Sequence, residues 1–319
     1  MIEYLIIQLD DTSTSYCHYD NPKRKESLIS LDILKSGILF AMKENLMIQF
    51  VYPDYELPSE YKEAIDSIDH SKIVSSLSED ESLRDEADVI VYHDWTGLSF
   101  GKFEASKSYV LRTTKADLFE RYLFIKDVLP KVTRLNVVIT DIESFKKEDF
   151  GRYKQILKTL SECLATLYAE GKIPQLNILT DRMMLSAMNN CGAGDTNVTL
   201  APNGKFYVCP AFYLYDESNS IGSLEGGLDI KNKQLYRLDH APICSHCDAY
   251  QCRRCVWLNQ KTTLEVNTPS HEQCVVAHLE RNASRELLSI LRKHGSFLPE
   301  QEDIKEIDYL DPFEKRDSW

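Results

Sequence analysis

Hydrophobic and polar positions along the first 190 residues follow two alternating periods. Short apolar runs at 4–9, 47–52, 89–93, 109–112, 135–140 and 176–179 predict six β-strands. The segments between them carry apolar residues at helical spacing, as in 31–45 behind Ser30, a favourable N-cap. Strands that alternate with helices predict an α/β fold with a parallel sheet. Six units favour a partial (β/α)6 barrel or a small doubly wound sheet over a full eight-unit barrel.

Capping residues predict where several other helices begin and end. Ser59 is expected to cap a short helix that reaches residue 68, and Thr114 an amphipathic segment that reaches residue 129. Gly171 is expected to end a long helix over 148–170. The stretch between the third and fourth strands contains glycines and no convincing helix.

The domain organisation follows from a change in the sequence pattern after Met188. Regular periodicity gives way there to Gly, Asn, Asp and Pro with cysteines among them, and helical spacing returns at 278–294. We therefore expect a (β/α) domain at 1–188, a cysteine-rich domain at 189–276, and a C-terminal helix with an acidic tail at 277–319.

The composition is that of a soluble globular protein, with 43% hydrophobic and 27% charged residues. No N-terminal segment resembles a signal peptide, and no apolar run approaches the roughly 20 residues that span a bilayer. The net charge of −13 argues against nucleic-acid and anionic-membrane binding. The acidic tail at 300–317 is either a solvated extension or a docking arm for a basic partner. We expect a cytoplasmic protein, where clustered thiols bind metal more often than they form disulfides.

Seven of the nine cysteines lie between residues 191 and 274, with the spacing of metal ligands. Thiolates select zinc or iron–sulfur clusters, and structural zinc sites usually use two Cys-x2-Cys pairs a dozen or more residues apart. Here only four residues separate the pairs, as in bacterial ferredoxins, where the last cysteine binds a second cluster. Iron–sulfur is therefore preferred, with zinc as the alternative. The expected ligands are Cys191, Cys209 and Cys255 for site one and Cys244, Cys247, Cys252 and Cys274 for site two.

The order of these cysteines resembles the SPASM domain, the auxiliary-cluster module of radical SAM enzymes that modify peptides. The text around Gly204, at 202–210, and the segment 221–224 are also similar to the family's. Two spacings in the central run are each one residue shorter than the family's. The resemblance implies two [4Fe–4S] clusters with the same division of ligands. It also implies a further cysteine upstream of Cys191 for site one; none is suitably placed, so an open iron is expected there.

The loop after the first strand departs from the radical SAM pattern. That family carries Cys-x3-Cys-x2-Cys there, three thiolates that hold the cluster to which SAM binds. The corresponding positions here are Asp10, Thr14 and Cys17, and a carboxylate and a hydroxyl are poor ligands for such a cluster. The family's Gly-Gly-Glu segment corresponds to 51–56, where Pro53 lacks a backbone donor and no glycine is present. SAM is therefore not expected as a cofactor, nor SAM cleavage by this chain alone.

The arrangement of the whole chain looks like the CXXX-repeat peptide maturases, which are associated with short cysteine-repeat peptides and a companion modification protein. The resemblance implies a SAM-less, radical-SAM-like iron–sulfur protein of ribosomal peptide maturation. It would bind a cysteine-containing precursor peptide or relay electrons to a companion maturation protein or radical SAM subunit. Two alternatives stay open: a stand-alone cluster-dependent redox enzyme acting on a peptide, and a zinc-stabilised binding module.

Several other residues have a functional and a structural interpretation. Cys17 is a residual ligand or an ordinary buried thiol, and Cys163 lies on the apolar face of a predicted helix, as a core residue does. His246, between two predicted ligands, is a solvent-facing spacer or a further ligand. Asp94, Asp141 and Asp181 follow predicted strands. At such positions an aspartate is either a ligand-binding residue of a barrel or a turn or helix-cap residue.

Overall fold

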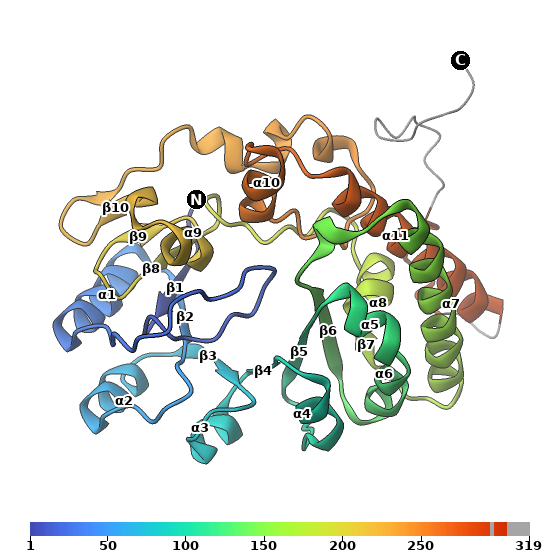
Figure 1. Cartoon of the computed structure of the whole chain (residues 1–319), viewed down its shortest axis with the longest axis horizontal. Coiled ribbons are helices and arrows are strands. Elements are labelled where there is room, and N and C mark those ends of the chain that lie inside the picture. Colours follow the sequence, from blue (N-terminus) through green and yellow to red (C-terminus); the bar gives the residue numbers. More distant parts are fainter. Residues whose placement is uncertain (294–296, 305–319) are drawn as a thin grey trace.

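The computed structural model describes residues 1–293 and 297–304, arranged around one sheet (Figure 1). The sheet order is β7-β6-β5-β4-β3-β2-β1-β8-β9, and neighbours are parallel except for the antiparallel pair β8 and β9. The strands are β1 (Tyr4–Gln8), β2 (Met47–Val51), β3 (His70–Ser75), β4 (Val89–Tyr92), β5 (Ser108–Thr113), β6 (Arg134–Ile139), β7 (Gln175–Leu176), β8 (Asn197–Leu200) and β9 (Phe206–Tyr207).

The helices that connect the parallel strands lie on one side of the sheet. Strands β1 to β7 are neighbours in sequence order, and right-handed connections then place every crossover on the same face. Figure 1 shows these helices outside an arc of strands, so the sheet is an open, partial barrel. They are α1 (Leu31–Glu44), α2 (Ser59–Asp66), α3 (Glu81–Glu86), α4 (Trp95–Phe100), α5 (Lys115–Arg121), α6 (Leu123–Val128) and α7 (Lys147–Ala169).

Alternation along the strands divides the buried side chains between two faces. Leu5 and Ile7 of β1 belong to the large core between the sheet and its helices. Ile6, one position along, belongs to a small inner cluster with valines and isoleucines of β2 to β5. Tyr16 packs against this inner cluster, so the loop after β1 reaches inside the arc. Figure 1 shows that loop in dark blue, projecting into the arc from β1.

The cysteine-rich part joins the same sheet and then leaves it. Strand β8 pairs in parallel with β1, so the sheet continues past residue 188, and the domain boundary there stays a prediction. Short elements follow: α9 (Pro210–Tyr215), the hairpin β10 (Gly222–Ser223) and β11 (Gly227–Leu228), and α10 (Val256–Thr263). The final helix α11 (His271–Lys293) packs against α7 and α8 (Asn177–Met184). The α/β fold with a partial barrel and a following cysteine-rich part is confirmed.

Three differences from the predicted elements have physical causes. Strand β3 was not predicted, because its first three residues are only partly buried and its apolar run is short. Helix α4 forms where no helix was expected, because Asp94 caps it by accepting a hydrogen bond from Gly97 N at 2.7 Å. Ser59 lies inside α2, whose N-cap is Pro58.

The predicted last strand at 176–179 is wrong after Leu176, where the chain turns into α8. The side chain of Asn177 takes over the pairing with β6: its Oδ1 accepts from Val137 N at 2.8 Å, and its Nδ2 donates to Val137 O at 3.0 Å. A side chain thus replaces a backbone ladder, which frees the backbone for a helix. The acidic tail expected at 300–317 lies outside the described residues from residue 305 onward.

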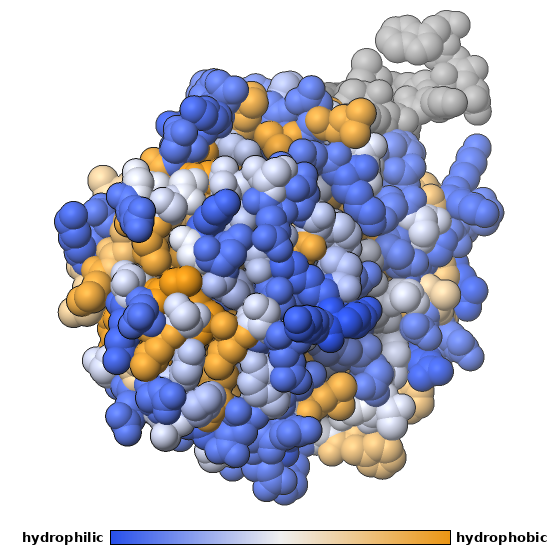
Figure 2. Space-filling view, turned by 60° about the vertical axis from the view of Figure 1, so that its left-hand side comes forward, coloured by the Kyte–Doolittle hydropathy of each residue, from blue (hydrophilic) through white to orange (hydrophobic). Residues whose placement is uncertain are grey.

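The molecular surface is mainly hydrophilic on the face shown in Figure 2, with hydrophobic groups gathered toward the left of the view. Exposed apolar side chains include Leu39 and Met42 of α1. Within the described part of the chain, no helix combines the length and apolar character required to span a membrane.

Candidate metal centre

Four of the clustered cysteines line one cavity. Cys244 opens a 3-10 turn over Cys244–His246 and Cys247 follows it, while Cys252 lies in the next loop and Cys274 in the first turn of α11. The turn and the helix therefore bring together thiols from both ends of the segment. These are the four residues predicted for site two, and metal binding by them remains a prediction.

Burial governs the chemistry of the site-two thiols. It raises the pKa of Cys252 to about 12 and that of Cys244 to about 11, and repulsion from Cys247 adds to both. Cys247 Sγ lies 3.5 Å from His278 Nε2 and accepts a hydrogen bond from Ala249 N at 3.4 Å. Metal binding requires the thiolate form, so a bound cation would offset the burial that otherwise keeps these thiols protonated.

The wall of this cavity also contains a buried cation. Arg254 is 1% exposed and its backbone has a φ of +37°. Its Nη2 donates to Tyr236 O, whereas Nε and Nη1 are buried with no hydrogen-bond partner in the described residues. A buried guanidinium with unsatisfied donors is costly unless an anion lies beside it. The thiol set and the cation together fit a negatively charged metal–thiolate group.

The residues predicted for site one also lie near one another. Cys209 directly precedes α9, and Cys255 directly precedes α10, where its Sγ accepts from Leu258 N at 3.4 Å. Cys191 is tied to the same loop, since its backbone N donates to Arg253 O at 3.1 Å. Burial, followed by repulsion from Cys191 and Cys209, holds the pKa of Cys255 well above its ordinary value.

Cys17 is a fourth thiol in this group, which the sequence spacing did not indicate. Burial and then repulsion from Cys191 raise its pKa to about 12, and Cys17 in turn raises the pKa of both Cys209 and Cys255. All four side chains are half-buried and pack against the same core. The fold thus brings the N-terminal loop, with Cys17, toward the residues predicted for site one, and the number of ligands there stays a prediction.

The loop that carries Cys17 is fixed across the carboxyl ends of the strands. Arg112 of β5 donates from Nε to Cys17 O at 2.9 Å and from Nη2 to Tyr19 O at 2.5 Å. Further contacts join Ser13 Oγ to Val51 O at 2.8 Å, Thr14 Oγ1 to His93 Nε2 at 2.8 Å, and His18 Nδ1 to Ile139 O at 2.9 Å. The loop therefore occupies the edge of the sheet where parallel α/β folds bind ligands.

Asp10 stabilises this loop from inside. Its side chain is fully buried, and Oδ1 accepts from Thr12 N at 2.7 Å and Thr12 Oγ1 at 2.5 Å. Oδ2 accepts from Ser27 N at 2.8 Å and from Tyr55 OH at 2.9 Å. The carboxylate is thus engaged by four protein donors. Asp10 and Thr14, at two of the three positions corresponding to radical SAM ligands, serve hydrogen bonds within the protein.

Zinc and iron–sulfur clusters need different spacings of their thiolates. Four thiolates at about 2.3 Å from one zinc would lie about 3.8 Å apart, whereas in a [4Fe–4S] cluster each thiolate binds a different iron. Within residues 1–293 and 297–304, no three or more His, Cys, Asp or Glu side chains are grouped to hold one metal ion. Iron–sulfur clusters at the two thiol groups, with zinc as the alternative, stay a prediction.

The remaining candidate residues have structural roles. Asp94 caps α4, as described above, and His246 is exposed, as expected of a spacer. Asp141 Oδ1 accepts from Lys115 N at 2.6 Å, and Asp181 pairs with Arg134 at 2.8 Å from within α8. Cys163 is half-buried on α7 and packs against the main core. Arg254 and His278, which line site two, were not identified from the sequence, where only their closeness to cysteines marks them.

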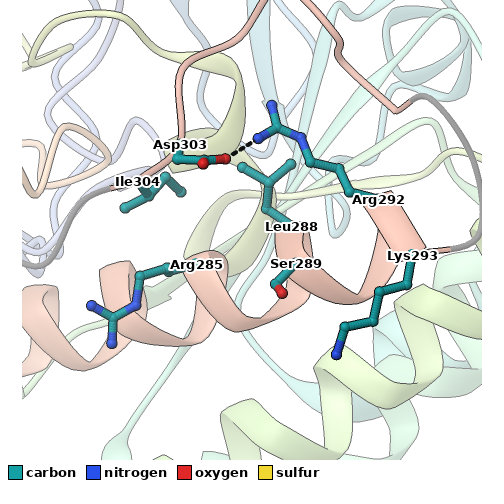
Figure 3. A pocket seen from close by; sticks show the side chains of 7 residues that line it. All are labelled: Arg285, Leu288, Ser289, Arg292, Lys293, Asp303 and Ile304. Atoms are coloured by element: carbon teal, nitrogen blue, oxygen red, sulfur yellow. Dashed lines mark hydrogen bonds and ion pairs between the residues drawn. The ribbon is translucent and has the colours of Figure 1, made fainter.

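A separate cavity of about 410 Å³ lies between α11 and residues 303–304. Figure 3 shows Arg292 reaching toward Asp303, to which it is ion-paired, with Arg285 and Lys293 on the same helix. None of its lining residues is a cysteine, so this cavity is not part of either thiol group.

No protein-family model matches the chain, and no curated protein matches its sequence. Solved structures do match. Native anSMEcpe with bound AdoMet superposes with a TM-score of 0.59 at 14% identity, over 91% of this chain and 100% of that chain. Streptococcus suis SuiB bound to precursor peptide SuiA gives 0.50 at 12% identity, over 86% and 76% of the two chains.

This chain has the fold of anSMEcpe and SuiB. A further match is anSMEcpe with bound AdoMet and the Cp18Cys peptide, with a TM-score of 0.58 at 12% identity over 92% of this chain. That coverage extends beyond the barrel into the cysteine-rich part. Membership of the CXXX-repeat group stays a prediction.

Proposed function

We propose that this chain is a SAM-less, radical-SAM-like iron–sulfur protein of ribosomal peptide maturation. It would carry two [4Fe–4S] clusters, one at each thiol group, and bind a cysteine-containing precursor peptide. Clusters bound at these positions would supply one-electron redox chemistry. A companion radical SAM subunit or maturation protein would carry out the modification. The parts at 1–188 and 189–276 would divide this work between a scaffold and a cluster module.

The observation that carries the proposal is the hydrogen bonding of the loop after β1, where protein groups already engage Asp10 and Thr14. A SAM-binding cluster needs three thiolates at Asp10, Thr14 and Cys17. The Asp10 carboxylate has four protein donors, and Thr14 is bonded to His93. Tyr55, from the segment that corresponds to Gly-Gly-Glu, supplies one of those donors. Protein groups therefore fill the positions where the family resemblance implies a cluster and its substrate.

Peptide binding is supported by the fold and by its neighbours. Both anSMEcpe and SuiB have been solved with bound peptides, and their fold is shared over 86–92% of this chain.

The test uses anaerobically purified, reconstituted full-length protein. We expect about eight iron and eight sulfide per chain, as two four-iron clusters require, and no 5′-deoxyadenosine when the reduced protein meets SAM. A SAM-cleaving maturase under the same conditions is the positive control. A cysteine-containing peptide should bind, and its Cys→Ser version serves as a matched probe of the thiol's contribution.

Either half of the proposal can fail independently. Formation of 5′-deoxyadenosine in proportion to protein would overturn the SAM-less assignment. A colourless protein with about two zinc ions would instead support the zinc-stabilised alternative. Turnover of the peptide with reductant alone would support the stand-alone redox enzyme.

A further inference from the structure

The N-terminal loop brings one thiol to the cysteine-rich part. Two contacts attach this loop to the segment after Cys209: Tyr213 OH donates to Asp11, and Lys23 Nζ pairs with Glu217 at 2.7 Å. Lys23 Nζ also lies 3.8 Å from the centre of the Tyr213 ring. The middle of the loop is anchored by Arg112, which donates to Cys17 O and Tyr19 O. Cys17 is therefore fixed in a loop whose two flanks, at Asp11 and Lys23, both contact the segment after Cys209.

We propose that Cys17 is the fourth ligand of site one and closes the cluster held by Cys191, Cys209 and Cys255. The inference rests on the proposed cluster content. It changes the character of the site, because an open iron would be free to bind a substrate thiolate, whereas a closed cluster is confined to electron transfer or structural support. It also gives the remaining cysteine of the degenerate SAM loop a new partner.

Ligand count and charge both favour this arrangement. Three cysteines leave one iron of a four-iron cluster without a protein ligand, and Cys17 supplies the fourth thiolate. On binding, the thiol proton passes to solvent and an iron–sulfur bond forms, with no change in oxidation state. The positive charges of Arg253 and Arg112 lower the pKa of Cys17 and would offset the added negative charge. All four side chains are half-buried against the same core, which limits the access of solvent to a cluster.

A closed site one would also couple the cluster to the barrel. The same loop contacts β2, β5 and β6 through the hydrogen bonds of Ser13, Arg112 and His18. Binding of the cluster would therefore order residues on both sides of Cys17. Hydrogen exchange of the loop should become slower when the cluster is present than when it is absent.

The test compares Cys17→Ala with Cys163→Ala in the full-length protein. Cys163 is a matched control, since it is half-buried on α7 and outside both thiol groups. Mild oxidation of Cys17→Ala should convert one cluster of the two to the [3Fe–4S] form, seen by its electron paramagnetic resonance, because one iron has lost its ligand. Wild type and Cys163→Ala should resist this conversion.

A second measurement is independent of oxidation. Added cysteine-containing peptide should change the Mössbauer spectrum of one iron in Cys17→Ala and leave the wild-type spectrum unchanged. Equal conversion in wild type and Cys17→Ala, or a peptide-dependent change in wild type, would overturn the inference. Absence of iron from wild type would instead refute the proposed cluster content, so the two failures are distinguishable. Cys191→Ala, expected to lose the same cluster, identifies which spectrum belongs to site one.

Discussion

Replacing Arg254 should stabilise the metal-free protein and lower the reduction potential of a cluster bound at site two. In the metal-free protein, its buried Nε and Nη1 have no hydrogen-bond partner in the described residues. Removing each unpaired donor should stabilise the folded protein by about 1–3 kcal/mol, whereas losing the hydrogen bond to Tyr236 O should destabilise it by about 1.5–3 kcal/mol. The balance for Arg254→Met is a gain of about 2 kcal/mol in the free energy of unfolding of the metal-free protein.

In the cluster-loaded protein, the same substitution should lower the midpoint potential of site two. Arg254 lines the cavity of site two, where its charge favours the reduced, more negative cluster. A loss of about 1.4–2.8 kcal/mol of differential stabilisation corresponds to a fall of roughly 60–120 mV in the one-electron midpoint potential. Arg254→Lys keeps the charge and should recover part of that fall.

Two assays check this pair of expectations. Denaturant unfolding of the metal-free protein measures the stability change, and a redox titration followed by electron paramagnetic resonance measures the potential. Arg253→Met is the control, because Arg253 is the exposed neighbour in sequence and its charge faces Cys17. The reasoning is refuted if Arg254→Met destabilises the metal-free protein and leaves both cluster potentials unchanged.

Three further predictions follow from buried polar groups. Burial raises the pKa of Glu280 to about 7, and Tyr153 OH donates to it at 2.7 Å. Because the folded protein keeps a proton that the unfolded chain releases near pH 4.3, stability should fall by about 3 kcal/mol from pH 4.3 to pH 7. Urea unfolding of Glu280→Gln should lack this fall, and an equally steep fall in the variant would contradict the assignment. Arg112→Met should leave loop carbonyls unpaired, cost roughly 3–5 kcal/mol, and speed hydrogen exchange over 13–20; unchanged exchange there would count against the anchor. The double variant Asp10→Cys, Thr14→Cys restores the three-cysteine spacing but removes the carboxylate that accepts four hydrogen bonds. We therefore expect lower stability and no 5′-deoxyadenosine. SAM cleavage by this variant would show that the loop geometry still permits a SAM cluster.

The sequence by itself determined the kind of fold, and it predicts metal chemistry at the cysteines. Period-2 and helical patterns are local properties, so strands such as β1 and helices such as α1 and α7 were predictable from adjacent residues. The seven close cysteines likewise predict metal ligands, because thiolates at such spacing are typical of zinc and iron–sulfur sites. Where a side chain replaced backbone pairing, as Asn177 does beside β6, the local pattern misled.

Only the tertiary structure decided which groups from distant segments meet. Cys17 is far in sequence from Cys191, and no local pattern joins them. The two residues are brought near each other by the parallel pairing of β1 with β8 and by the folding of the loop inside the arc. The buried position of Arg254 depends equally on the turn around Tyr236, whose carbonyl oxygen accepts a hydrogen bond from Nη2 of Arg254. Burial and proximity are properties of the packed chain, and they decide the environment and the accessibility of the two thiol groups.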